Sequence, residues 1–298
     1  MQLTNKYSPY LLFSVAFVIL FAHLDVLVVN IMEARNFITA REMIVDGNWL
    51  LTTINGEPRY QKPPLPTWLT ALSALIFGLK NLTALRLPAV IMGLFTVMIS
   101  YAMALKYTRN RDYALWSGLV LTTSFYLVFS GRTGQWDIFT HAFVMGAIYS
   151  LYQLFSGAKK RWFYALLTGL LIAASFMSKG PVSIYALFLP LILAQAISGS
   201  LKGLKNNLGP LILILLVAVL GSVWWHAYIN IADPENLLAI TKKETTNWAN
   251  YNVKPFYYYW NFFIQSGLWT IPALLSLAYP YLKSRVINPR GYALSFWW

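Results

Sequence analysis

Cysteine is absent from this chain of 298 residues, and histidine occurs only three times. Without cysteine the chain can form no disulfide and offers no thiolate to a metal, so its redox compartment stays open. His23, His141 and His226 lie in or near separate apolar runs and lack the spacing of metal ligands. These absences argue against a conventional zinc site. No cofactor is indicated with certainty, and a divalent cation is the one candidate that remains.

Charged residues are also scarce, at 11% of the chain, whereas 58% of the residues are hydrophobic. The sequence contains no Walker A loop, no GxGxxG motif after a strand and no HExxH motif. The formal charge of +13 raises the question of a nucleic-acid partner. Basic loops beside a membrane account for this charge better, so we expect no nucleic acid to bind.

Long apolar runs recur along the chain and predict membrane-spanning helices. A helix needs about 20 apolar residues to cross a bilayer, and only helices and closed barrels can cross without unpaired backbone groups. The runs lack the alternation of strands, so we predict an all-α, polytopic transmembrane helical bundle. About eight spans are expected, at residues 9–29, 81–105, 112–130, 138–157, 161–178, 181–198, 208–229 and 258–282.

The connections between these spans alternate in charge. One set is short and basic, with Asp112 as its only acid, and the other set carries the remaining acids. By the positive-inside rule the basic set faces the cytoplasm, so the long loops at 30–80 and 230–257 face outward. Residues 1–298 are expected to form a single domain. The segment from Arg290 to Trp298 looks like the start of a ninth span that is cut short, which indicates a fragment or a truncated gene product.

The outer loop at 30–80 is unusually polar for this chain. Helical periodicity over residues 33–46 predicts a short amphipathic helix on the membrane surface. Its apolar face holds Ala34, Phe37, Ile38, Ile44 and Val45, together with Arg41, and its polar face holds Arg35, Asn36, Thr39, Glu42 and Asp46. Asn55-Gly56 predicts a turn, Lys62-Pro63-Pro64 a rigid segment, and residues 65–79 a second interfacial or partly inserted helix.

Two acids at the outer boundary are candidate catalytic residues. Glu33 stands at the start of the predicted surface helix, and Asp137 opens the span at 138 on the same side. A carboxylate at the membrane boundary can act as a general base or bind a cation. Each acid also has a structural alternative, because Glu33 suits the start of a helix and Asp137 suits an N-cap.

Four cations, Arg59, Lys62, Arg132 and Lys179, are expected on this outer side at the depth of lipid phosphates. Such a cluster suits phosphate, because arginine binds it in bidentate fashion and lysine acts as a point charge. The alternative is ordinary contact of long cationic side chains with headgroups.

Aromatic residues are also frequent near the outer boundary. Tyr60, Trp248 and Tyr258 either belong to an interfacial belt or line a site for a sugar or a prenyl chain. His226 and Glu244 are weaker candidates from the same region.

The order of these motifs resembles a known family. The carrying residues are Glu33-Ala34-Arg35, Ala40-Arg41-Glu42-Met43, Asp46-Gly47-Asn48-Trp49, Asn55-Gly56, Tyr60-Gln61-Lys62-Pro63-Pro64-Leu65, Trp68-Leu69, Phe77-Gly78, Leu85-Arg86-Leu87-Pro88, Asp137 and Lys179-Gly180-Pro181. They look like the integral-membrane GT-C glycosyltransferases. The branch with the protein O-mannosyltransferases and the lipid A aminoarabinose transferase is the most similar. The resemblance covers about residues 20–185 well and the rest only in hydropathy.

The resemblance implies transfer of a sugar from a polyprenyl-phosphate donor to a lipid, protein or glycan acceptor, outside the cytoplasmic membrane. Residues 30–80 would form the outer catalytic loop. Lys62 matches a family lysine that contacts the lipid phosphate, and Asp137 matches the second loop acid. The family's Asp-Glu pair reads Met32-Glu33 here, so either Glu33 takes the role of the missing acid, Asp25 or Asp137 compensates, or activity is altered. The implied mechanism is direct displacement with inversion, in which cations stabilise the leaving phosphate.

Two other functions compete with this one. A transporter or lipid-handling protein without chemistry predicts charges near the bilayer midplane and paired broken helices. The observed charges cluster at one boundary instead, which favours the enzyme. A degenerate family member that serves as a partner subunit is the second rival, because Met32 replaces the family acid and the chain is short.

Overall fold

The computed structural model describes residues 3–197, 207–250, 254–261, 267–272 and 274–275. Helices dominate, as predicted. The α-helices are α1 (Leu3–Phe21), α2 (Ile31–Val45), α3 (Leu65–Phe77), α4 (Leu82–Thr108), α5 (Arg111–Thr122), α6 (Phe125–Arg132), α7 (Trp136–Phe155), α8 (Arg161–Lys179), α9 (Leu189–Ile197), α10 (Leu208–Ala232) and α11 (Pro234–Asn250). A π-helix, η1 (Ile184–Phe188), precedes α9, and 3-10 helices η4 (Phe256–Asn261) and η5 (Gly267–Trp269) follow α11.

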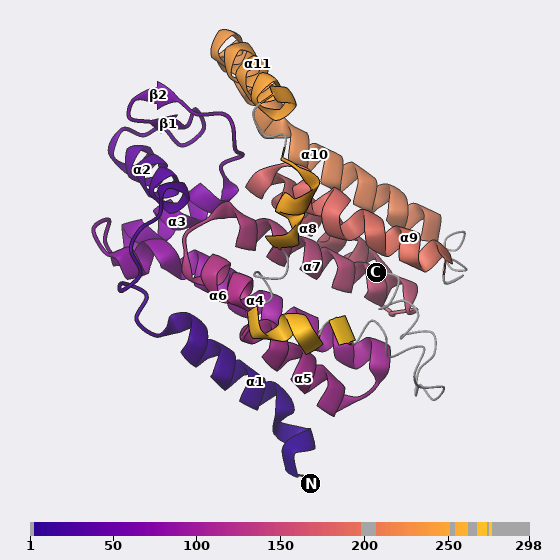
Figure 1. Cartoon of the computed structure of the whole chain (residues 1–298). Coiled ribbons are helices and arrows are strands. Elements are labelled where there is room, and N and C mark those ends of the chain that lie inside the picture. Colours follow the sequence, from indigo (N-terminus) through magenta and orange to yellow (C-terminus); the bar gives the residue numbers. More distant parts are fainter. Residues whose placement is uncertain (1–2, 198–206, 251–253, 262–266, 273, 276–298) are drawn as a thin grey trace.

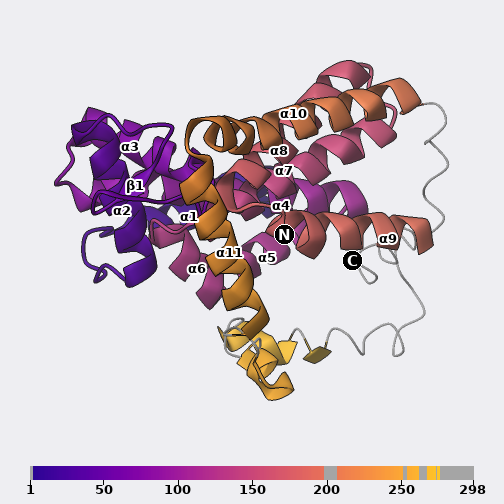
Figure 2. The ribbon, with the colours of Figure 1, turned by 90° about the horizontal axis from the view of Figure 1, so that it is seen from above.

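The long helices form one bundle, and the first loop covers one end of it. Figures 1 and 2 show α2, α3 and the hairpin of β1 (Thr53–Ile54) and β2 (Glu57–Pro58) gathered at that end, with α11 projecting from the bundle. In the bundle α4 packs against α7, and α8 packs between α7 and α10. The first loop is therefore a compact cap of two helices and a hairpin on the bundle's end.

Small residues allow α8 and α10 to approach closely. A Cβ added to Gly169 of α8 would lie 2.8 Å from Cβ of Val217, and one added to Gly221 of α10 would lie 2.7 Å from Cβ of Ala173. Helices in lipid gain little from hydrophobic burial against each other, so close packing through small residues is a main source of their association.

Among the described residues, four helices are long and apolar enough to cross a membrane, namely α4, α7, α8 and α10. They confirm the spans predicted at 81–105, 138–157, 161–178 and 208–229. Helices α5 and α6 pass the same test together but are bent by 63°, so the span predicted at 112–130 is broken rather than straight. The span predicted at 181–198 begins as η1 and continues as α9, which makes it shorter than expected.

The first predicted span, 9–29, has the wrong boundaries, because α1 runs from Leu3 to Phe21. Just after the last residue of the helix, Arg132 Nη2 donates to the carbonyl of Ala22 at 2.5 Å and to that of His23 at 3.1 Å. A guanidinium satisfies carbonyls that have no partner within the helix, and His23 then turns the chain with a positive φ of 48°. A contact from α6 therefore decides where α1 stops.

The surface helix predicted at 33–46 is confirmed as α2, but its orientation differs from the prediction. Asn36, Thr39 and Glu42, expected on a solvated face, are buried. The Glu42 carboxylate accepts hydrogen bonds from Thr53 Oγ1 at 2.6 Å and from the backbone nitrogen of Asn55 at 2.6 Å. It thereby holds the predicted turn at Asn55-Gly56. The polar face of α2 points into the protein because the rest of the first loop supplies its hydrogen-bond partners.

The C-terminal predictions are tested only in part. Residues 230–257, expected as an outer loop, contain the 17-residue helix α11. Of the span predicted at 258–282, the described residues include η4 and η5, which are 3-10 rather than α-helical. The rest of that span, and the expected start of a ninth at 290–298, lie outside the described residues.

Candidate active site at the covered end of the bundle

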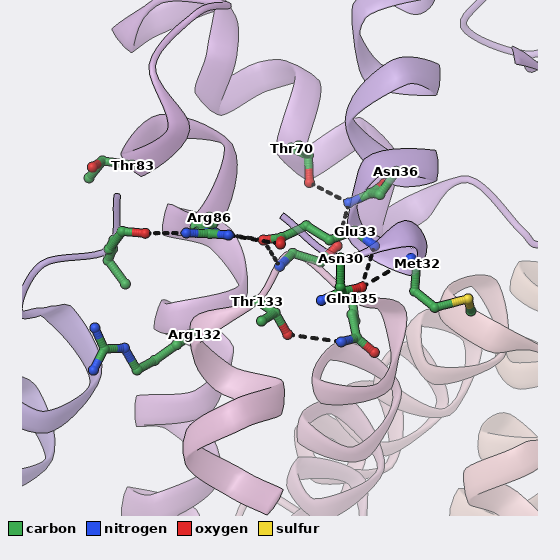
Figure 3. Close-up of polar contacts among 12 residues, drawn as sticks. Asn30, Met32, Glu33, Asn36, Thr70, Thr83, Arg86, Arg132, Thr133 and Gln135 are labelled. Atoms are coloured by element: carbon green, nitrogen blue, oxygen red, sulfur yellow. Dashed lines mark hydrogen bonds and ion pairs between the residues drawn. The ribbon is translucent and has the colours of Figure 1, made fainter. Parts of the chain in front are cut away.

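Glu33 forms a buried ion pair with Arg86. Arg86 of α4 donates from Nε to Glu33 Oε1 at 2.6 Å and from Nη2 to Oε2 at 2.8 Å. Both side chains are 0% exposed. The backbone nitrogen of Gly134 donates to Oε1 at 2.9 Å, and Arg86 Nη1 donates to the carbonyl of Leu24. Figure 3 shows this cluster, in which Glu33 joins α2, α4 and the α6–α7 loop.

This geometry gives Glu33 a structural task. Both carboxylate oxygens are engaged, and no part of the side chain is accessible to an acceptor. A buried ion pair persists only when its geometry and hydrogen bonds offset the loss of hydration, as they do here. The catalytic role expected for Glu33 stays a prediction, whereas its role in holding three elements together is visible.

Asn36 extends the same network towards the α6–α7 loop. Its Nδ2 donates to the carbonyl of Gly134 at 2.8 Å and to Thr70 Oγ1 at 3.1 Å, while its Oδ1 accepts from Thr67 Oγ1 at 2.7 Å. A Cβ on Gly134 would lie 2.4 Å from Cε1 of Phe37, so only glycine fits against α2. The loop that begins α7 is therefore fixed between α2 and α3.

Asp137, in the first turn of α7, forms a salt bridge with Lys179 at the end of α8. The two side chains are 16% and 21% exposed, respectively, so the pair is accessible, unlike Glu33. One turn further along α7, His141 Nδ1 lies 2.8 Å from Ser183 Oγ. The structure thus brings together two predicted site residues that are 42 positions apart in the sequence.

Lys62 is the cation of this region without a direct partner. Its side chain is half-buried, and in the part of the chain that the structure describes no hydrogen bond or salt bridge joins it. Burial lowers the pKa of Lys62, and repulsion from Lys179 lowers it further, while Glu244 and Asp137 oppose this shift. A half-buried ammonium beside a second cation favours an anionic ligand.

Arg59 completes the cationic side of the site. It donates from Nη1 to the Arg35 carbonyl at 2.6 Å and to Thr39 Oγ1 at 2.9 Å, and its guanidinium carbon lies 4.8 Å from the centre of the Trp136 ring. Burial, together with the charge of Arg35, lowers the pKa of Arg59 to about 10. The guanidinium is therefore held in place, with part of its donor capacity already used.

A cavity of about 10 Å³, room for about one water molecule, lies between these groups. Its lining residues are Thr39, Thr52, Arg59, Lys62, Pro64, Thr67 and Trp136. The Trp136 indole nitrogen is buried and makes no hydrogen bond within the described structure. A buried donor without a partner is costly, and the Trp136 side chain lines the same cavity as the two cations. The arrangement offers an N–H and two positive charges to an anionic oxygen.

Arg132 does not join this cluster. Figure 3 shows its side chain pointing away from Glu33 and Arg86, and its guanidinium donates to the carbonyls of Ala22 and His23 just after α1. Arg59, Lys62 and Lys179 remain. Because these contacts occupy the Arg132 guanidinium at the end of α1, its expected role in binding phosphate stays a prediction.

The aromatic candidates Tyr60 and Tyr258 lie in different surroundings. Tyr60 is buried and donates its hydroxyl to Asp233 Oδ2 at 2.7 Å, which ties the first loop to the end of α10. Burial and Asp233 raise the pKa of the Tyr60 phenol, so it stays a donor. Tyr258 is 48% exposed and lies under the Lys254 ammonium at 5.7 Å. The side chain of Trp248 lies outside the described part of the structure.

Within the described residues, no group of three or more His, Cys, Asp or Glu side chains could hold a metal ion. The divalent cation considered above therefore stays an untested candidate. Two contributors were not singled out from the sequence as site residues, namely Trp136 and Arg86. A signal for Arg86 existed, because a charge inside an apolar run requires a buried partner.

Known proteins resemble this chain in sequence and in fold. Residues 61–225 match the family described as dolichyl-phosphate-mannose-protein mannosyltransferase. The chain belongs to this family. The family resemblance predicted from the first loop is thus confirmed, and with it the GT-C assignment. Together with the long apolar helices, the match identifies an integral membrane protein.

Curated relatives in the family include an uncharacterized protein of Aquifex aeolicus, 30% identical over 74% of this chain and 43% of the relative. Another is the undecaprenyl phosphate-alpha-4-amino-4-deoxy-L-arabinose arabinosyl transferase 2 of Proteus mirabilis, 29% identical over 68% of this chain and 36% of the relative. This chain spans about half the length of such relatives or less.

The fold also matches solved structures. ArnT from Cupriavidus metallidurans bound to undecaprenyl phosphate superposes with a TM-score of 0.79, at 20% identity, over 97% of this chain and 53% of that chain. The apo form gives a TM-score of 0.73. At this identity the match shows the fold alone, and it confirms the predicted helical membrane bundle.

Proposed function

We propose that this chain binds a polyprenyl-phosphate-linked sugar donor and transfers the sugar to an acceptor on the outer face of the cytoplasmic membrane. The observation that carries the proposal is Lys62, a half-buried cation beside Arg59 and Lys179 that has no direct partner among the described residues. Family membership and the printed activity of relatives such as the Proteus mirabilis arabinosyl transferase support it. The acceptor is a lipid, a protein or a glycan.

In this proposal the cavity widens to admit the donor phosphate, which then lies against Lys62, Arg59 and the Trp136 N–H. A phosphate would relieve the repulsion between Lys62 and Lys179 and would satisfy the buried indole nitrogen. When the bond to the sugar breaks, negative charge grows on the phosphate oxygen. Fixed positive groups that meet this charge lower the barrier without further reorganisation.

Asp137 is the acid best placed to act on the acceptor. It is partly exposed and lies beside the cations, whereas Glu33 is buried and fully paired. In the transfer step Asp137 accepts the proton of the acceptor hydroxyl as the oxygen attacks the anomeric carbon, and the polyprenyl phosphate leaves from the opposite side with inversion. The ion pair with Lys179 orients the Asp137 carboxylate before the acceptor arrives.

The site lies at the ends of α7 and α8 rather than near their middles. This placement supports an enzyme at a membrane boundary over a transporter with charges at the midplane. The distribution of basic loops supports an outward orientation of the site.

The proposal is tested by the donor lipid that the purified chain retains. We expect native mass spectrometry to detect a bound polyprenyl phosphate that is lost in Lys62→Ala and kept in Arg35→Ala. Arg35 is exposed and does not line the cavity, and among the described residues its side chain hydrogen-bonds only to Met32, so it is a matched cation outside the cavity. Equal retention, or equal turnover in a transfer assay, would count against the donor site.

One observation favours a second function. At the family's Asp-Glu pair, this chain has Met32 followed by a fully engaged Glu33. A partner subunit that binds donor lipid without transferring sugar would tolerate this change. Donor retention that depends on Lys62, with no turnover in wild type, would support this function, whereas turnover that Asp137→Asn abolishes would support the enzyme.

A further inference from the structure

A second pocket lies at the opposite end of the bundle from Lys62. It has a volume of about 430 Å³ and lies between the C-terminal parts of α4 and α7. Helix α4 contributes Tyr101 and Lys106, with Arg109 just after its end, and α7 contributes Tyr149 and Tyr152. None of these residues takes part in the site proposed above.

The position of the pocket follows from the length of α7. Asp137 stands in the first turn and Ser156, which lines the pocket, directly follows the last. At 1.5 Å per residue these positions are about 28 Å apart, close to the thickness of a hydrocarbon core. Because α7 is long and apolar enough to span, the pocket lies at headgroup depth on the other membrane face. That face carries the basic loops.

Among the described residues, the hydrogen bonds around the pocket leave some donor groups unused. Lys106 Nζ donates to Gln153 Oε1 at 3.1 Å, and Gln153 Nε2 donates to the Tyr149 hydroxyl at 2.8 Å. Gln153 therefore uses its acceptor on the lysine, and the Tyr149 oxygen accepts from Gln153. What remains is the Tyr149 O–H and the other ammonium protons of Lys106, and both are donors.

The two cations of the pocket have no acid to neutralise them. In the described chain no salt bridge involves Lys106 or Arg109, and the nearest acid along the sequence, Asp112, pairs with neither. Arg109 adopts a left-handed conformation with φ of 56° at the position after α4, where glycine is the usual residue. Its side chain lines the pocket from this turn.

We propose that this pocket binds the phosphate of an anionic phospholipid headgroup from the cytoplasmic leaflet. Lys106 and Arg109 would contact the phosphate oxygens, and the Tyr149 hydroxyl would donate a third hydrogen bond. Tyrosine rings suit this depth, because one end is apolar and the other is polar. The lipid would join α4 to α7 on the face opposite the donor site.

The test offers the intact chain, in detergent, equal amounts of phosphatidylglycerol and phosphatidylcholine with the same acyl chains, and counts the retained lipids by native mass spectrometry. The pocket variant is Lys106→Gln/Arg109→Gln. Its matched control is Lys159→Gln/Lys160→Gln, which removes the same charge from exposed residues on the same face outside the pocket. Tyr149→Phe is a third variant that keeps every charge.

We expect the wild type to retain phosphatidylglycerol over phosphatidylcholine, and the pocket variant to lose roughly tenfold or more of this retention. The control should change it by less than about twofold, and Tyr149→Phe should lower it measurably. Equal retention by pocket variant and control, or no preference between the two lipids, would overturn the proposal. Displacement of the lipid by millimolar inorganic phosphate would also overturn it, because the site would then bind soluble phosphate.

Two readouts keep this result separate from the donor site. The pocket variant should keep the wild-type melting temperature and its Lys62-dependent polyprenyl phosphate. If the pocket variant does not fold, Tyr149→Phe decides the outcome, since it removes one donor without changing any charge. Unchanged phosphatidylglycerol retention in a folded Tyr149→Phe would then reject the proposed contact.

Discussion

The buried pair of Glu33 and Arg86 leads to a prediction that separates a structural role from a catalytic one. Arg86→Met leaves an uncompensated carboxylate at a position with no exposed surface. Removing one partner of a buried ion pair costs about 3–5 kcal/mol, because the other charge stays buried alone. We expect a loss of this size in the free energy of unfolding, measured by denaturation in lipid bicelles.

The double variant Glu33→Leu/Arg86→Met removes both charges at once. Replacement of a whole buried pair by apolar residues of similar volume is often neutral or stabilising by about 1–4 kcal/mol. Arg86→Met already removes the partner of the Leu24 carbonyl, so the double variant adds only the loss at the Gly134 backbone nitrogen, which costs roughly 1–3 kcal/mol. The double variant should therefore be no less stable than Arg86→Met alone, although each single change is costly.

Arg41→Met is the matched control, because Arg41 is 56% exposed and lies 3.9 Å from Glu42. An exposed pair is worth about 0–1 kcal/mol, so this change should be nearly silent. The reasoning fails if Arg86→Met costs no more than Arg41→Met, or if the double variant loses the sum of the two single effects. Sugar transfer by the double variant gives the second test. A folded double variant that transfers sugar confirms a structural Glu33, and one that binds donor but cannot transfer assigns Glu33 to catalysis.

Three further predictions concern the site and its support. In a titration of donor retention, retention should fall as pH rises through the lowered pKa of Lys62, since only the ammonium attracts phosphate. Lys62→Arg should move this loss to higher pH, because arginine stays charged. Trp136→Phe keeps the ring but removes the buried N–H, so donor affinity should fall roughly 10- to 100-fold in a lipid-binding assay, the value of one hydrogen bond to a charged group. Gly134→Ala should destabilise the chain by about 1–3 kcal/mol through overlap with Phe37. Phe37→Ala in the same chain should recover part of the unfolding free energy. An unaltered melting temperature in Gly134→Ala would contradict the close contact.

Sequence patterns predicted the parts of the fold that depend on local composition. Helices α4, α7, α8 and α10 were expected because a long apolar run in lipid must satisfy its backbone internally. The turn at Asn55-Gly56 was expected because both residues tolerate a positive φ, which both adopt. Lys62 and Asp137 were expected near each other because both loops face the same side, and the electrostatic contact between them supports this.

Patterns failed where a distant residue decides the outcome. The end of α1 depends on Arg132, which follows it by more than one hundred positions. The amphipathic pattern of α2 identified a polar face correctly, but amphipathicity does not say whether that face meets water or other polar groups. Asn36 and Glu42 meet Gly134 and the hairpin instead of solvent.

By itself the sequence determined the class of the protein, the long spans, the charged boundary and the family, because each of these is carried by local composition or by short motifs in order. Only the tertiary structure decided which charges are already paired. It joined Glu33 to Arg86 and Asp137 to Lys179, and it left Lys62 without a direct partner beside the free Trp136 nitrogen. Pairing depends on the distance between atoms that are far apart in the chain, and the folded chain alone sets that distance.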